Sequence, residues 1–230
     1  MKPTTEKSAD IAVPETGDSY EPIHTGRFMD FEDFLDFGDA EERWEFIGGL
    51  PVVPRSKTIG TSRMQTHLNR LLHEQVEKAA ASFDVWGYGA MVRIDDFNAL
   101  LPSVLVEPRP EQRREWLICD PALVIEASFG CERDRAVLHE RRAMYLSPGR
   151  MPPVAEYVAV IDSGPPDLHR DHRPLMNFRP FTGRTYTAAS RARRVYRFRP
   201  GGQLDRFEGD EPVELTSIEL TLPAEAFFLD

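Results

Sequence analysis

Two glutamates of this 230-residue chain stand in apolar surroundings, where a carboxylate needs a partner. Glu126 directly follows the apolar run Leu123–Ile125, and Glu45 stands between Trp44 and Phe46. An acid in a buried strand loses part of its hydration, so a metal ion, an arginine or a set of hydrogen-bond donors must compensate its charge. The alternative is a carboxylate at a strand end that reaches solvent. Both glutamates are therefore candidate site residues.

Hydrophobic periodicity predicts the elements that position these acids. The clearest helix spans 64–79, with its apolar side chains on one face and Thr61 or Ser62 as its cap. Shorter helices are expected at 29–35, where Asp30 stands near the start, and at 133–145 and 222–228. Strands are expected at 43–47, 50–53, 85–94, 102–106, 121–128, 155–162, 194–199 and 203–207, with Gly48 and Gly49 as a hairpin turn between the first two.

The order of these elements favours one mixed central β-sheet flanked by helices, an α/β (α+β) fold, over a doubly wound array. The length suits a single large domain. Residues 1–26 are rich in Pro, Thr, Ser, Glu and Asp and are predicted to form a disordered N-terminal tail. The folded domain is expected at 27–230, with an arginine-rich insertion at about 168–194.

The composition is that of a globular protein, with 41% hydrophobic and 29% charged residues. No apolar run approaches the roughly 20 residues that span a bilayer, and the N-terminus lacks the apolar stretch of a signal peptide. We therefore expect a cytoplasmic protein without a membrane partner. Cys119 and Cys131 lack the spacing of metal ligands and are expected to be reduced and structural.

The charge of the chain is segregated. Residues 168–199 contain nine arginines against one acid, Asp171, a formal +8 that leaves −18 on the rest of a chain whose net charge is −10. Arginines interleaved with aromatic residues form a platform for phosphates and unstacked bases. The candidate nucleic-acid-binding residues are Arg191, Arg193, Arg194 and Arg197. The alternative is a solvated segment whose arginines neutralise the acidic remainder.

Several segments resemble, in chain order, motifs of the Uma2 family, a large bacterial group of restriction-endonuclease-like proteins also known as DUF820. The resemblance runs from about Met29 to Phe228. The matching segments, each with its family motif, are 44–52 (YELIDGELV), 102–106 (PDVLV), 123–128 (LVVEVLS), 134–145 (DR…K…LY) and 154–162 (VPEYWLVD).

The resemblance implies a restriction-endonuclease-like PD-(D/E)XK core that hydrolyses DNA with Mg²⁺ or Mn²⁺. In such a site acids on adjacent strands hold the ion, and a lysine orients the attacking water. The ion lowers the pKa of the water and stabilises the charge of the leaving oxygen. By this resemblance Glu45 and Glu126 are metal ligands, and Ser103, Ser128 and Arg141 stand at the other catalytic positions.

Those last three positions depart from the family pattern. Ser103 replaces the aspartate of the PD motif, Ser128 stands at the lysine of the ExK motif, and Arg141 replaces the helix lysine. Arginine is a poor substitute for a neutral amine, although it binds phosphate well. Two interpretations stay open: Glu45 and Glu126 hold one Mg²⁺, with Glu107, Asp95 or Asp96 replacing the lost acid, or Glu126 forms a structural ion pair with Arg141.

Three functions follow from these alternatives. The chain is a Mg²⁺-dependent endonuclease of the Uma2 type, a catalytically inactive relative that binds nucleic acid, or an interaction protein such as a homodimer.

Overall fold

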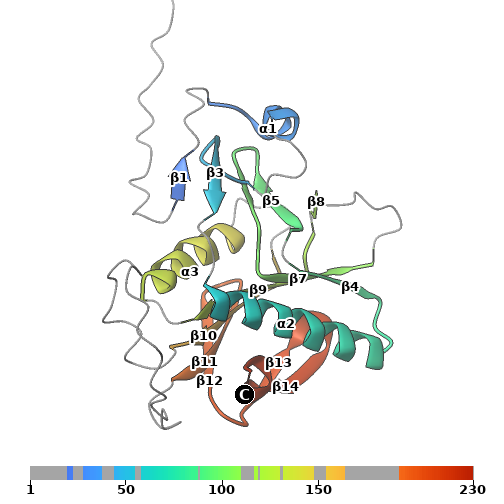
Figure 1. Cartoon of the computed structure of the whole chain (residues 1–230). Helices are drawn as coiled ribbons and strands as arrows, with labels where there is room; N and C mark the ends of the chain where they lie inside the picture. Colours follow the sequence, from blue (N-terminus) through green and yellow to red (C-terminus); the bar gives the residue numbers. More distant parts are fainter. Residues whose placement is uncertain are drawn as a thin grey trace, which may run out of the picture.

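The computed structural model describes residues 20–22, 28–37, 44–54, 58–87, 89–109, 117–118, 120–129, 132–147, 154–163 and 192–229. Within these residues the chain forms two six-stranded sheets and a two-stranded hairpin (Figure 1). The mixed α+β class is confirmed, but the strands divide between two sheets where one central sheet was expected. None of the described helices has the length and apolarity needed to cross a membrane.

The central sheet has the strand order β12-β11-β10-β9-β7-β4. Its middle strands β9 and β10 are parallel, and the other neighbours are antiparallel. Strands buried on both faces favour continuous apolar runs, which explains Leu123–Ile125. The bounds are β4 Phe83–Trp86, β7 Val104–Pro108, β9 Leu123–Phe129, β10 Glu156–Asp162, β11 Arg193–Arg199 and β12 Gln203–Phe207.

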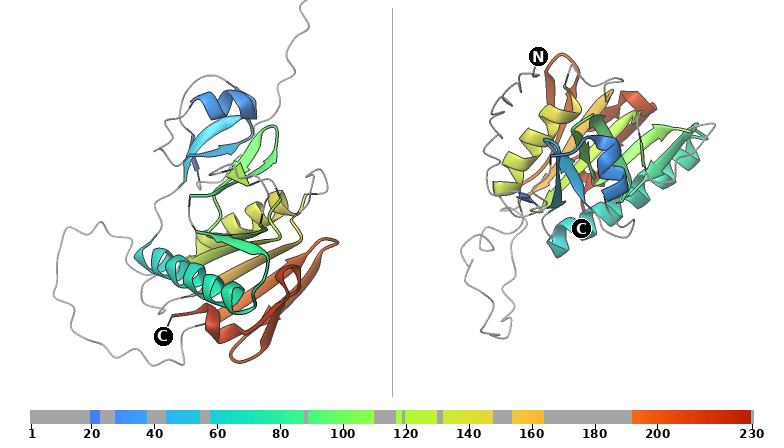
Figure 2. Two further views of the ribbon diagram at one scale, coloured as in Figure 1. Left: turned by 90° about the vertical axis from the view of Figure 1, so that its right-hand side faces the viewer. Right: turned by 90° about the horizontal axis from the view of Figure 1, so that it is seen from above.

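Two helices cover opposite faces of this sheet, α2 (Ile59–Lys78) and α3 (Glu132–Tyr145) (Figures 1 and 2). Ile125 packs with α2, whereas Val124 packs with α3. Because successive side chains of a strand point to opposite faces, Glu126 lies on the α3 side. The cap of α2 is Thr58, three residues before the first cap expected from the sequence, and its hydroxyl accepts a hydrogen bond from the Thr61 amide at 3.1 Å.

The N-terminal sheet has the order β1-β3-β2-β6-β5-β8, and it lies with α1 at the top of Figure 1 and of the left view of Figure 2. Phe34 of α1 stacks on Phe46 of β2 at 4.6 Å between ring centroids. Asp30 lies at the start of α1, as expected, and its side chain accepts a hydrogen bond from the Asp33 amide at 2.9 Å. The bounds are β1 Tyr20–Pro22, α1 Phe31–Phe37, β2 Glu45–Ile47, β3 Leu50–Pro54, β5 Met91–Asp95, β6 Asn98–Leu100 and β8 Leu117–Ile118.

Three features differ from the sequence prediction. The strand expected at 85–94 is two strands, β4 and β5, which belong to different sheets and are separated by Gly89 at φ +126°. Strand β1 falls within the expected tail, and the rest of 1–26 lies outside the described residues. Residues 168–191 of the arginine-rich segment also lie outside the described residues. The C-terminal helix expected at 222–228 is instead the end of a hairpin followed by a 3₁₀ helix.

The C-terminal segment packs on the α2 face of the central sheet. It joins this face through buried apolar side chains such as Val213 and Phe227. Its elements are β13 Pro212–Leu215, η3 Thr216–Ile218, β14 Leu220–Pro223 and η4 Ala224–Phe227.

The β2–β3 turn yields a first prediction, because this hairpin carries Glu45. Gly48 and Gly49 have φ of +58° and +79°, a region that costs other residues about 1–2 kcal/mol. A Cβ at Gly48 meets nothing within 4 Å, whereas one at Gly49 overlaps the ring of Phe28. We expect Gly48→Ala to lower the free energy of unfolding by about 1 kcal/mol and Gly49→Ala by about 2 kcal/mol or more. Urea denaturation measures both, and in a Phe28→Ala background the two costs should become equal.

Candidate active site

Four residues that the family resemblance assigns to the site converge in the structure. Glu45 lies on β2, Ser103 directly before β7, Glu126 on β9 and Arg141 on α3. All four are buried, with exposed fractions of 0%, 1%, 4% and 7%. The structure therefore brings Glu45 and Glu126 together around Arg141.

The guanidinium of Arg141 lies between the two glutamates. Its Nε donates to Glu126 Oε1 at 2.6 Å, and Nη1 donates to Glu45 Oε1 and Oε2 at 2.7 and 2.9 Å. Its Nη2 donates to the carbonyl oxygen of Leu101 at 2.8 Å. Such charge-assisted bonds from a planar fork are short and directional. Arg141 thus pairs with Glu126, as one of the two interpretations of the sequence held, and with Glu45 as well.

Backbone and hydroxyl groups also donate hydrogen bonds to the same two carboxylates. The Leu101 amide donates to Glu45 Oε1 at 2.8 Å. The amide and hydroxyl of Ser103 donate to Glu126 Oε2 at 3.2 and 3.0 Å, while the same hydroxyl accepts from the Ala127 amide at 3.0 Å. Each of the four carboxylate oxygens therefore accepts at least one hydrogen bond. We call Glu45, Leu101, Ser103, Glu126 and Arg141 the Arg141 cluster.

Tyr145 is a neighbour of the cluster that was not predicted as a site residue. It stands four residues after Arg141, on the same face of α3, and is fully buried. Among the described residues its hydroxyl has no hydrogen-bond partner. Burial raises the pKa of Tyr145 well above the usual range; Arg141 acts in the opposite direction, and Glu126 and Glu45 raise it further. The phenol is therefore neutral at physiological pH. The i, i+4 spacing from Arg141 is the signal that could have found it.

A divalent ion does not fit the residues as they are arranged. Mg²⁺ is bound by carboxylate and other hard oxygens, but the oxygens that face one another here already accept hydrogen bonds from Arg141. The hydroxyl of Ser103 is neutral, so it supplies no anionic ligand, and it donates its proton to a hydrogen bond with Glu126. Across the described residues no group of three or more His, Cys, Asp or Glu side chains is placed to hold a metal.

The other acids that could have replaced the lost aspartate are engaged by different partners. Glu107 accepts from the Trp86 indole at 2.8 Å, Asp95 accepts from the Asn98 amide group at 2.8 Å, and Asp96 pairs with Arg93 at 2.7 Å. Ser128 is buried, and the alternation of β9 places it on the same face as Glu126.

The arginines of β11 are paired with acids of the same chain. Arg193 lies 3.5 Å from Asp162 and donates to the Leu229 carbonyl, and Arg194 donates to Glu208 at 2.9 Å. Arg197 was predicted to bind nucleic acid, but its side chain is only 7% exposed and donates to Asp205 at 2.7 Å. Its position is that of a structural residue. Arg191 lies outside the described residues.

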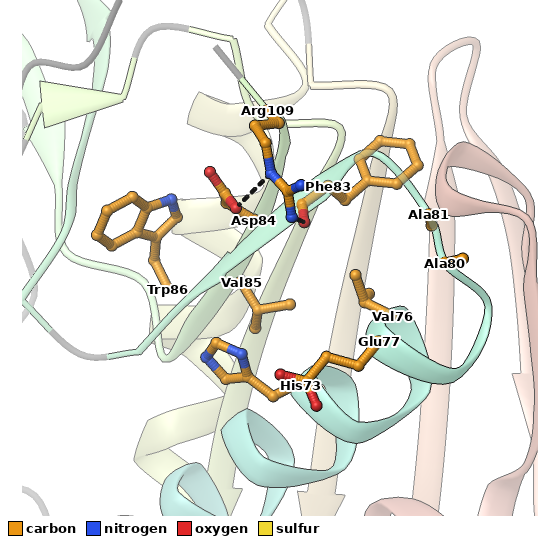
Figure 3. A pocket seen from close by; sticks show the side chains of 10 residues that line it. All are labelled: His73, Val76, Glu77, Ala80, Ala81, Phe83, Asp84, Val85, Trp86 and Arg109. Atoms are coloured by element: carbon orange, nitrogen blue, oxygen red, sulfur yellow. Dashed lines mark hydrogen bonds and ion pairs between the residues drawn. The ribbon is translucent and has the colours of Figure 1, made fainter. Parts of the chain in front are cut away.

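A cavity of about 610 Å³ opens between α2 and the edge strand β4, away from the Arg141 cluster. Figure 3 shows His73 and Glu77 on one side of it, and Trp86 and the Asp84–Arg109 pair (3.1 Å) on the other. None of its lining residues belongs to the cluster.

Comparisons with known proteins establish the fold. No family model matches the sequence, and no curated protein matches it. The structure is similar to the crystal structure of a protein from Anabaena variabilis ATCC 29413 described as a putative nuclease belonging to DUF820. The TM-score is 0.58 at 15% identity, over 87% of this chain and 97% of that chain. The chain therefore has the fold of a DUF820 nuclease-like protein, the family that its motifs resemble.

Removal of Arg141 should be strongly destabilising. Arg141→Ala leaves two buried carboxylates without their cation, and breaking a buried ion pair in this way costs about 3–5 kcal/mol. The matched control is Arg109→Ala, whose guanidinium is 61% exposed beside Asp84 and whose loss should cost less than about 1 kcal/mol. Urea denaturation of both variants measures the difference. Equal costs would contradict the central role of Arg141.

The Arg197–Asp205 pair predicts a pH dependence of stability. The hydrogen bond from Arg197 holds the pKa of Asp205 below its usual range, with a further contribution from Arg199. A pKa lowered by folding adds stability above the unfolded value of about 3.9, and this stability is lost as the pH falls through the folded value. Asp205→Asn should therefore destabilise the protein at neutral pH, with a difference from wild type that shrinks below about pH 4.

Thermal unfolding across this pH range tests the Asp205 prediction. Asp210→Asn, in the exposed turn after β12, is the control and should behave as wild type throughout. A difference for Asp205→Asn that stays constant with pH would show that the stabilising role of Asp205 does not depend on its ionisation.

Proposed function

We propose that this chain is a Uma2-type nuclease-fold protein that binds nucleic acid, with DNA as the expected partner, and that has lost phosphodiester hydrolysis. One observation carries the proposal: Arg141 binds both acids that would otherwise hold the metal. The neutral side chain at Ser103 supports it, because metal-assisted hydrolysis needs anionic oxygen ligands. Arg141 also cannot act as a general base, because its guanidinium stays protonated at physiological pH.

The binding part of the proposal rests on charge and on the fold. An acidic protein binds a polyanion only where basic residues are concentrated. The arginines on β11 are neutralised by acids of the same chain, so the surplus positive charge comes from the arginines before them. These are Arg170, Arg173, Arg179, Arg184 and Arg191.

The second candidate is a Mg²⁺- or Mn²⁺-dependent endonuclease. The observation that favours it is the convergence of Glu45, Ser103, Glu126 and Arg141 in one buried site, at the positions that the family resemblance assigns. This candidate requires Arg141 to leave both carboxylates.

An assay of cleavage and binding separates these functions. We expect no nicking of supercoiled DNA in Mg²⁺ or Mn²⁺, together with binding of DNA that weakens as salt increases. Cleavage that Glu126→Gln abolishes would overturn the proposal in favour of the endonuclease. Neither cleavage nor binding at low salt would leave an interaction protein, such as a homodimer.

The source of the binding charge can be tested in the same assay. Replacing Arg179, Arg184 and Arg191 by glutamine should weaken binding and reduce the slope of log affinity against log salt by about one for each phosphate that is no longer neutralised. Replacing Arg63, Arg70 and Arg109, which lie outside this segment, is the matched control and should leave the slope unchanged.

A further inference from the structure

The oxygen atoms around Arg141 are of the kind that binds hard metal ions. The guanidinium contacts both oxygens of Glu45, one oxygen of Glu126 and the carbonyl oxygen of Leu101, at 2.6 to 2.9 Å. Carboxylate and carbonyl oxygens are the usual ligands of Mg²⁺, Mn²⁺ and Ca²⁺. In the protein as it stands, each of these four oxygens is an acceptor for an N–H group of Arg141.

We infer that Arg141 is the resident cation of this site, and that the two glutamates form a divalent-cation site only when its guanidinium is removed. The wild-type protein then neither needs nor binds a divalent ion at the Arg141 cluster. The arrangement explains why two acids are tolerated at 0% and 4% exposure with a serine, and not a third acid, beside them.

Geometry argues against displacement of Arg141 by an ion in the wild-type protein. Arg141 is fixed by α3, whose Leu138 and Tyr145 pack in the core between the helix and the central sheet. A displaced guanidinium would need new acceptors, because a buried charge without partners is costly. Its short aliphatic stem is also buried, as the 7% exposure of the whole residue shows.

Truncation of Arg141 leaves the oxygens in place and removes the competing donors. The Leu101 amide still holds Glu45, and Ser103 still holds Glu126. Two carboxylates then share a buried space without a cation, which raises their affinity for a divalent ion. Binding to the folded state alone stabilises it by mass action.

The experiment measures Mn²⁺ binding by calorimetry and by thermal unfolding, without nucleic acid. Wild type should show no binding heat and the same melting temperature in Mn²⁺ and in EDTA. Arg141→Ala should melt about 10 °C lower in EDTA and recover about 5 °C or more in saturating Mn²⁺. Glu45→Gln/Arg141→Ala should lose the recovery, because it removes one of the two anions. Arg109→Ala should resemble wild type.

Each outcome decides the inference. Mn²⁺ binding by the wild-type protein overturns the inference. A folded Arg141→Ala variant that binds no Mn²⁺ also overturns it, as does a double variant whose melting temperature recovers in Mn²⁺ as much as that of Arg141→Ala. If Arg141→Ala is unfolded in EDTA, circular dichroism in Mn²⁺ replaces the melting curve, and folding that Mn²⁺ does not restore counts against the inference.

The inference rests on the proposed function in one respect, that no metal is bound at the wild-type site. The inference and the proposed function are tested by different measurements. If the wild-type protein binds no DNA, the proposed function is wrong, but the inference about Arg141 is unaffected. If Arg141→Ala binds no Mn²⁺, the inference is wrong, but the proposed function is unaffected.

Discussion

The contact between Arg141 and two buried carboxylates is the constraint on which the arrangement of the chain depends. It joins α3 to β2 of the N-terminal sheet and to β9 of the central sheet, and through Leu101 it also holds the connection between β6 and β7. A guanidinium with this little exposure must have its acceptors in fixed directions. The cluster is therefore both the candidate site and the joint at which the two sheets meet.

Ser103 and Arg141 are matched to each other through Glu126. The hydroxyl of Ser103 donates to one carboxylate oxygen at 3.0 Å, and Arg141 donates to the other at 2.6 Å. An aspartate at position 103 would place a third carboxylate against Glu126, and a single arginine could not neutralise all three acids. A lysine at 141 would bring a point charge without the fork that reaches both glutamates. Two of the three departures from the motifs that the sequence resembles, Ser103 and Arg141, thus balance the charge of Glu126 together.

Much of this site was visible in the sequence because local patterns encode it. The apolar flanks marked Glu45 and Glu126. The strand expected at 121–128 and the helix expected at 133–145 correspond to β9 and α3, with bounds that differ by one or two residues. The choice between a metal and an arginine was not visible, because the side chains involved are 15 and 96 residues apart in the chain and meet only in the tertiary structure. The same holds for the division of 85–94 between two sheets, which depends on pairing with β7 and β6.

Stability alone does not explain a buried cluster of two acids and an arginine. Apolar residues of similar volume often stabilise a core as well as a buried ion cluster does or better, because removing charges from water is costly. The cluster does constrain the placement of α3, because Arg141 contacts acceptors on β2, on β9 and at Leu101 at the same time. In this fold, which is similar to that of a DUF820 protein, the positive charge beside the two buried acids comes from a side chain of the same chain, Arg141.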